Sequence, residues 1–240
     1  MNVMRFIRTL AFPMAGALLA VCGPLSAQFD DKPTVLEWEF AVYLDDKPIG
    51  GHDFRLVHEG PGLTLETEAS FDVKFLFFTA YTYRHRCVET WDRRGLASIH
   101  AKTDANGTAS HVSGSRINGS FKVQVNDETR ELPPEIMSFA YWNPEILQQD
   151  RLLNSQTGEY EPFEVIERGE SPVDVNGERV PARRYDLMVK GKPVSVWYAV
   201  SDQRWLALES VARGDRKLRY VPVKVPANAT AIVSTFNQLD

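Results

Sequence analysis

Three side chains that can do chemistry lie two positions apart in one short stretch of the sequence. They are His85, Cys87 and Glu89. On a β-strand, alternate side chains point to the same face, and their Cα atoms lie about 7 Å apart. An imidazole, a thiolate and a carboxylate in such a row can hold a transition metal. Alternatively, the histidine can activate the cysteine thiol as a nucleophile.

The neighbours of this row favour a structural role instead. Tyr81, Tyr83 and Trp91 belong to the same face of the same predicted strand. The simplest interpretation is an aromatic inner wall that contains a few hydrogen-bonded polar groups, with Cys87 as a small buried residue. We therefore expect no metal and no cofactor. The sequence also contains no GxSxG elbow, HExxH pair, phosphate-binding loop or dinucleotide fingerprint.

The elements that must position these residues are predicted to be antiparallel strands. Apolar and polar residues alternate from Val35 onward, and turn signals such as Asn106-Gly107, Asn118-Gly119 and Asn176-Gly177 interrupt the alternation. This spacing is typical of consecutive β-hairpins. No shift in composition marks a linker. We expect residues 28–240 to form a single all-β domain, a long curved antiparallel meander or an open barrel.

Two segments depart from the simple pattern. Residues 63–78 form the longest strand candidate, which would run about 50 Å at ~3.3 Å per residue, so we expect a bend or bulge within 75–80. Residues 132–150 break the alternation with prolines, and Asn143 before Pro144 is typical of a helix start. We expect one or two short helices between residues 134 and 149, packed on the concave side of the sheet with their aromatic side chains turned inward.

Aromatic residues are concentrated on strands that would line the concave face. Such a face either encloses an apolar cavity or is filled as a closed core. Arg183 and Arg184 are neighbours in a predicted strand, so the one that points inward is either half of an ion pair or an anchor for an anionic headgroup. The candidate ligand-binding residues are Phe75, Phe77, Tyr81, Tyr83, His85, Tyr141, Trp142, Arg183 and Trp197.

Residues 1–27 have the pattern of a bacterial export signal. Two arginines precede an interrupted apolar run, residues 10–21, which is shorter than the ~20 residues of a membrane span. Small residues up to Ala27 suit cleavage after that position, and lipoprotein processing at Cys22 is the alternative. We expect a periplasmic protein whose mature chain has no transmembrane segment.

Charge and cysteine content exclude further classes. The full chain has a formal net charge of −5, and removal of two arginines with the signal makes the mature chain more acidic. Because phosphate binding relies on clustered positive charge, we expect no nucleic-acid partner. Loss of Cys22 leaves only Cys87, so no disulfide can form within the mature chain.

Several motifs are distinctive. They are MSFAYWNP at 137–144, Leu152-Leu153-Asn154, QTGEY at 156–160, YRHR at 83–86, VPARRY at 180–185 and WLALE at 205–209. Together they resemble an uncharacterised family of exported proteobacterial proteins, domain of unknown function 6134, over nearly the whole mature chain. The family has no established activity, so the resemblance implies no catalytic role. Residues 196–220 also resemble, at the level of the fold alone, the curved sheets of periplasmic lipoprotein carriers.

These observations favour a periplasmic binding or carrier protein for an apolar or amphipathic ligand, such as a lipid, without catalysis. The chief alternative is a structural or interaction protein with a filled core that contacts another protein of the cell envelope. A hydrolase or metal-dependent enzyme is the third hypothesis.

The signal pattern yields a direct prediction. Protein recovered from its own cells should begin at Gln28, because cleavage after Ala27 follows a short apolar core and a small-residue site. Intact-mass analysis checks this. An N-terminus at Cys22 with attached acyl chains would contradict it.

Overall fold

The computed structural model describes residues 33–59, 62–75 and 78–227. The predicted export signal, Phe77 and the side chain of Phe75 lie outside the described residues. The described strands are β1 (Thr34–Leu44), β2 (Lys47–Glu59), β3 (Gly62–Phe75), β4 (Phe78–Asp92), β5 (Gly95–Ala105), β6 (Thr108–Ile117), β7 (Ser120–Val125), β8 (Glu128–Leu132), β9 (Arg151–Leu153), β10 (Tyr160–Glu170), β11 (Val173–Val175), β12 (Glu178–Val180), β13 (Ala182–Val189), β14 (Lys192–Ala199), β15 (Trp205–Val211) and β16 (Lys217–Lys224).

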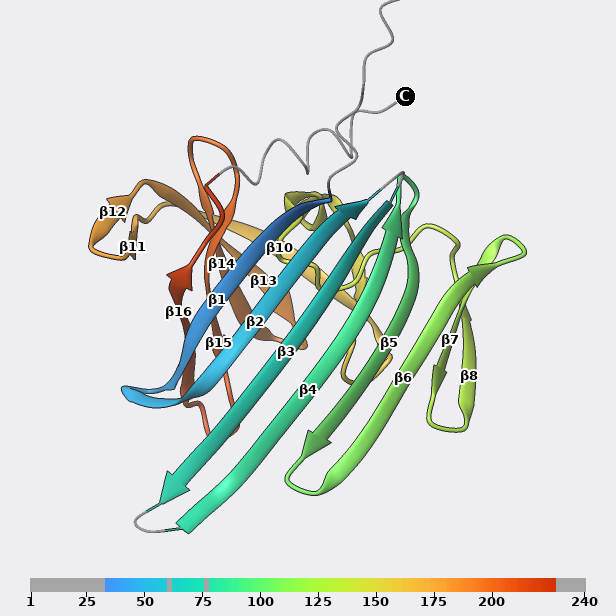
Figure 1. The fold of residues 1–240 in the computed structure, drawn as a ribbon, viewed down its shortest axis with the longest axis horizontal. Helices are drawn as coiled ribbons and strands as arrows, with labels where there is room; N and C mark the ends of the chain where they lie inside the picture. The colour runs from blue at the N-terminus through green and yellow to red at the C-terminus, as the bar shows by residue number, and fades with distance from the viewer. Residues whose placement is uncertain (1–32, 60–61, 76–77, 228–240) are drawn as a thin grey trace, which may run out of the picture. The chain divides into compact units, whose positions relative to one another are not determined.

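The described strands form one large antiparallel sheet and a small two-stranded one made of β11 and β12. The order in the large sheet is β8-β7-β6-β5-β4-β3-β2-β1-β16-β15-β14-β13-β10-β9. The first and last strands therefore pair in its interior, and the sheet continues from them as two arms (Figure 1). The sheet is curved, and its order ends at β8 and β9 rather than closing into a barrel. The prediction of an all-β, curved antiparallel fold is confirmed.

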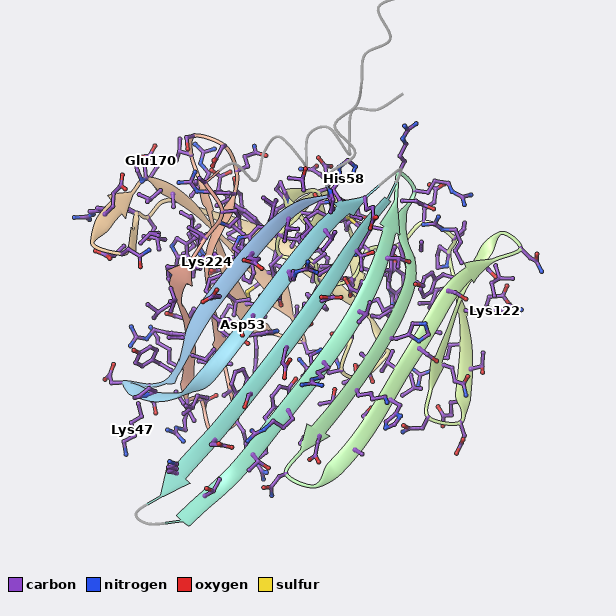
Figure 2. The ribbon with its side chains drawn as sticks, in the orientation of Figure 1. Lys47, Asp53, His58, Lys122, Glu170 and Lys224 are labelled. Atoms are coloured by element: carbon purple, nitrogen blue, oxygen red, sulfur yellow. The ribbon has the colours of Figure 1, made fainter. Side chains whose placement is uncertain are left out.

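Alternation of residue types explains why the strands form. In β1 every second residue from Leu36 to Leu44 is buried, and the residues between them are partly or fully exposed. The outer face is charged across several strands, with Arg55 on β2 paired to Glu66 on β3 at 3.3 Å and Lys224 on β16 paired to Glu37 on β1 at 2.6 Å. Figure 2 shows Asp53 and Lys224 among the side chains of this region. One face of the sheet is thus available for the core.

The inner faces of both arms share one hydrophobic core. It includes residues from β1 to β7 on one arm and from β9, β10 and β13 to β15 on the other. Trp38 and Trp205, both fully buried, illustrate the contact between distant parts of the chain, because the Trp38 indole Nε1 donates to the Trp205 carbonyl at 3.2 Å. Phe40 packs on Trp205 with 4.5 Å between ring centroids.

The strand predicted over residues 63–78 is present as β3, but it ends earlier, and the irregularity expected within 75–80 lies elsewhere. β3 ends at Phe75, β4 begins at Phe78, and these two residues pair across a hairpin. The register shift lies between Val73 and Lys74, before the expected region. The sequence does not indicate the end of the strand at Phe75, because the residues from 75 to 78 are all apolar and include no glycine, proline or asparagine.

The prediction of one or two short helices between residues 134 and 149, packed on the concave side, is not confirmed. The segment from Pro133 to Asp150, which we call the connecting segment, contains one 3-10 helix in the described chain, η1 (Pro144–Gln148). The Asn143 side chain caps it by accepting from the Glu145 N–H at 3.0 Å. The residues after Pro134 form bends and a short bridge instead of a helix.

The connecting segment packs into the core, as its aromatic residues predicted. Trp142 is 1% exposed and meets Trp91 edge to face at 5.5 Å. Phe139 and Tyr141 are partly buried against the same core. Because these side chains come from an irregular segment, the fold needs other contacts to hold that segment in place.

Arg116 on β6 provides such a contact. Its side chain is 6% exposed and forms an ion pair with Asp92 at 2.5 Å. The guanidinium also donates to the carbonyl of Pro134 at 2.7 Å and to that of Leu96 at 2.8 Å. The Leu96 N–H in turn donates to Ile136 at 2.9 Å, so one arginine fixes the start of the connecting segment to the sheet.

We expect Arg116→Met to lower the free energy of unfolding by about 2–4 kcal/mol, because it removes a buried guanidinium and leaves the carbonyls of Leu96 and Pro134 without this donor. Arg130→Met is the matched control, since Arg130 and its partner Glu128 are both largely exposed. It should stay near the wild-type value. Urea denaturation of the three proteins checks this, and equal losses in both variants would contradict the assigned role of Arg116.

Candidate functional site

A cavity of about 280 Å³ lies beside the shared core. Its walls come from the inner faces of β2, β3 and β4 on one arm and from β13 to β16 on the other. The connecting segment and the turn between β9 and β10 complete it. Residues far apart in the sequence therefore meet around one partly open pocket.

Two histidines line this cavity, and both are held neutral. His52 Nδ1 lies 3.2 Å from the Tyr220 hydroxyl, and its ring stacks on Phe54 at 4.1 Å. His85 Nδ1 lies 2.9 Å from the Thr103 hydroxyl, and its Nε2 lies 3.4 Å from that of Ser155. Burial lowers the pKa of His52 to about 3 and that of His85 to about 4. Nε2 of His52 is buried and has no hydrogen-bond partner among the described residues.

Glu89 is a buried carboxyl group in the same wall. It is 4% exposed, and its Oε2 accepts from the Trp91 indole at 3.2 Å. Its Oε1 lies 4.0 Å from the Cys87 sulfur. Burial raises the pKa of Glu89 to about 7, against the lowering influence of Ser138 and Trp91. The carboxyl group is thus balanced between its neutral and charged forms near neutral pH.

The row His85, Cys87 and Glu89 lies on one buried face, as predicted. Burial, reinforced by Glu89, raises the pKa of the Cys87 thiol far above its usual range. This shift disfavours the thiolate that a nucleophile or a metal ligand requires. In the described part of the chain, no group of three histidine, cysteine, aspartate or glutamate side chains is arranged to hold a metal ion.

Three of the candidate ligand-binding residues, His85, Tyr141 and Trp142, line the cavity. Tyr83 lies outside it and stacks on Phe71 at 5.2 Å. Tyr81 is 40% exposed. The side chain of Phe75 and the whole of Phe77 lie outside the described residues.

The remaining two candidates, Arg183 and Trp197, are also outside this cavity. Arg183 is half-exposed and pairs with Glu167 at 3.4 Å. Trp197 donates from its indole to the Ser171 hydroxyl at 3.1 Å, and the Arg184 guanidinium lies 5.1 Å from its ring. Arg184 itself pairs with Asp186 at 2.9 Å. Both arginines are therefore half of an ion pair rather than free anchors.

Sequence reasoning missed His52, Ser155 and Tyr220 as cavity residues. Of these three residues, only His52 could have been found from the local sequence, because it lies two positions before Phe54 on the inward face of a strand. Its partner Tyr220 is separated from it by 168 positions. Only the pairing of β1 with β16 brings these residues together.

The buried histidines make a prediction about pH. Their pKa values lie below the usual 6.5, so the unfolded chain binds more protons, and the stability they contribute is lost as the pH falls below about 6.5. Glu89 acts in the opposite sense, since its raised pKa favours folding at low pH and this contribution is lost as the pH rises through about 7.

His85→Asn should therefore reduce the loss of unfolding free energy between pH 7 and pH 5 by about 2 kcal/mol relative to wild type. His100→Asn, at an exposed position, serves as the control and should leave the pH dependence unchanged. Denaturant unfolding at the two pH values measures the effect. Parallel pH profiles for His85→Asn and wild type would show that His85 is not held neutral.

The described part of the chain contains no helix with the length and hydrophobicity of a membrane span. A comparison with curated protein sequences finds no match.

The fold is similar to a crystal structure of a beta-barrel-like protein of domain of unknown function DUF1849 from Brucella abortus. The TM-score is 0.52 at 14% sequence identity, over 80% of this chain and 96% of that chain. At this identity the similarity concerns the fold alone. The sequence profile of the family described as "Domain of unknown function (DUF6134)" matches residues 40–223, and the chain therefore belongs to this family.

Proposed function

We propose that this protein, after export to the periplasm, binds a small amphipathic molecule in the cavity between its two arms. The observation that carries the proposal is the presence of orphan polar atoms in a wall that combines apolar, aromatic and polar side chains. His52 Nε2 and Trp142 Nε1 are buried and have no hydrogen-bond partner among the described residues, and both residues line the cavity. Because the great majority of buried polar atoms in folded proteins are paired, such atoms are natural partners for a ligand.

The size of the cavity defines the ligand. A volume of about 280 Å³ lies just below the ~300–1,000 Å³ typical of small-molecule sites. It suits a compact molecule better than a lipid with two long acyl chains. It also argues against the alternative of a completely filled core, because core residues such as Phe54 and Leu208 line open space.

A hydrolase is less well supported. The closest arrangement to a nucleophile and base is Ser155 beside His85, with 3.4 Å between the hydroxyl and Nε2. The group that orients His85 is the Thr103 hydroxyl rather than a carboxylate. A histidine whose pKa is lowered to about 4 is also a weak base at neutral pH.

Native mass spectrometry of protein purified from its own periplasm tests the proposal by looking for a co-purifying small molecule. As a defined probe, 2-phenylethanol should bind saturably and raise the unfolding temperature. Ser210→Phe should abolish this binding, since Ser210 lines the cavity and a phenyl ring would fill it. Ser70→Phe, on an exposed position of β3, should bind like wild type.

Two results would refute the proposal. One is the absence both of a co-purifying molecule and of any saturable binding of small aromatic probes. The other is unchanged probe binding in Ser210→Phe, which would place the probe elsewhere on the protein.

A further inference from the structure

We infer that the ligand of this cavity is a small organic cation, a protonated amine with an apolar body, and that Glu89 is its counter-ion. This inference rests on the proposed function and names the chemical class of the ligand. It depends on three observations: the charge of the cavity wall, the unpaired state of Glu89 and the aromatic surroundings.

The first observation is the sign of the charge that the wall can carry. Among the described residues that line the cavity there is no lysine, arginine or aspartate. Burial lowers the pKa of His52 and His85, and it raises the pKa of Cys87, Tyr141 and Tyr220, so each of these groups is held neutral. Glu89 is the one lining residue in the described chain that can be charged near neutral pH.

The second observation is that Glu89 has only neutral partners. Its oxygens meet the Trp91 indole at 3.2 Å and the Cys87 sulfur at 4.0 Å, and no ion pair of Glu89 occurs among the described residues. An ionised carboxylate can accept about four hydrogen bonds, so the contacts with Trp91, Cys87 and Ser138 leave acceptor capacity unused. A buried carboxylate without a cation is costly, and a cationic ligand would supply the missing partner.

The third observation is the aromatic character of the wall. Phe54, Phe139, Tyr141, Trp142 and Tyr220 line the cavity with Glu89. The faces of aromatic rings attract organic cations, and they also pack against the apolar part of an amine. An anionic ligand would find no cationic side chain to bind it and would be repelled by ionised Glu89. The wall therefore selects for positive charge.

Because Glu89 ionises near neutral pH, the affinity for a cationic ligand should depend on pH, whereas the affinity for a neutral ligand should not. The neighbours of Glu89 are Trp91, Cys87 and Ser138. The other ionisable groups near it are His85, on the same strand, and His52, in the cavity wall; both are held neutral, so none of these groups titrates between pH 6 and pH 8. A cation favours the charged carboxylate, so amine affinity should rise by about tenfold from pH 6 to pH 8. A neutral ligand of the same shape should show no such rise.

The test compares 2-phenylethylamine with 2-phenylethanol, which differ at one polar group, by calorimetric titration of the full-length mature protein. We expect the amine to bind at least about tenfold more tightly than the alcohol at pH 8. In Glu89→Gln this preference and the pH dependence should both disappear while the alcohol still binds. Glu66→Gln, on the outer face where Glu66 pairs with Arg55, is the matched control and should keep both.

Each outcome separates the two proposals. Equal binding of amine and alcohol by wild type would overturn the cation inference and leave the binding function intact. A preference that persists in Glu89→Gln would overturn the role of Glu89. Failure of both probes to bind would refute the binding function itself. If Glu89→Gln does not fold, the comparison of the two probes and their pH profiles in wild type still decides the inference.

Discussion

The whole structure depends on the pairing of β1 with β16. Most other neighbours in the sheet are consecutive hairpins, whereas this pair joins the two ends of the described chain. Without it the two arms would be separate sheets, each with an apolar face open to water. With it, Trp38 from the first strand and Trp205 from the second arm enter one core. Closing such a long loop is entropically costly, and the burial of large aromatic side chains from both arms offsets that cost.

Much of this fold can be predicted from the sequence because alternation is strict where one face is buried. β1 begins next to Val35, where the alternation starts, and the predicted hairpin turns fall at Asn106, Asn118 and Asn176, which adopt positive φ. The strand β8 could not be predicted from alternation, because four of its five residues are exposed and it therefore has no apolar row. β10 could not be predicted as a whole either, because its second half is largely exposed to solvent and lacks alternating apolar residues. Alternation of apolar and polar residues identifies a strand with one buried face, but it gives no indication of a strand whose two faces are both exposed to solvent.

The candidate site was less predictable than the fold. His85 and Glu89 could be placed together because they lie on one strand at a spacing of two. Tyr141 and Trp142 could be assigned to the interior because they are large aromatic residues. His52 and Tyr220 meet through strand order, which depends on the whole chain and not on local pattern. The connecting segment then has two roles, because Trp142 packs on Trp91 in the core and also forms part of the cavity wall.

The burial of Cys87 has a consequence for chemical durability. A thiol on the surface of an exported protein is exposed to oxidants and to the cysteines of other chains, and it can be converted to sulfenic acid or to mixed disulfides. Cys87 is 3% exposed and its thiolate is disfavoured by its surroundings, so both routes are slow. The fold thus protects the Cys87 thiol by enclosure, so this side chain keeps its chemical form without a disulfide partner among the described residues.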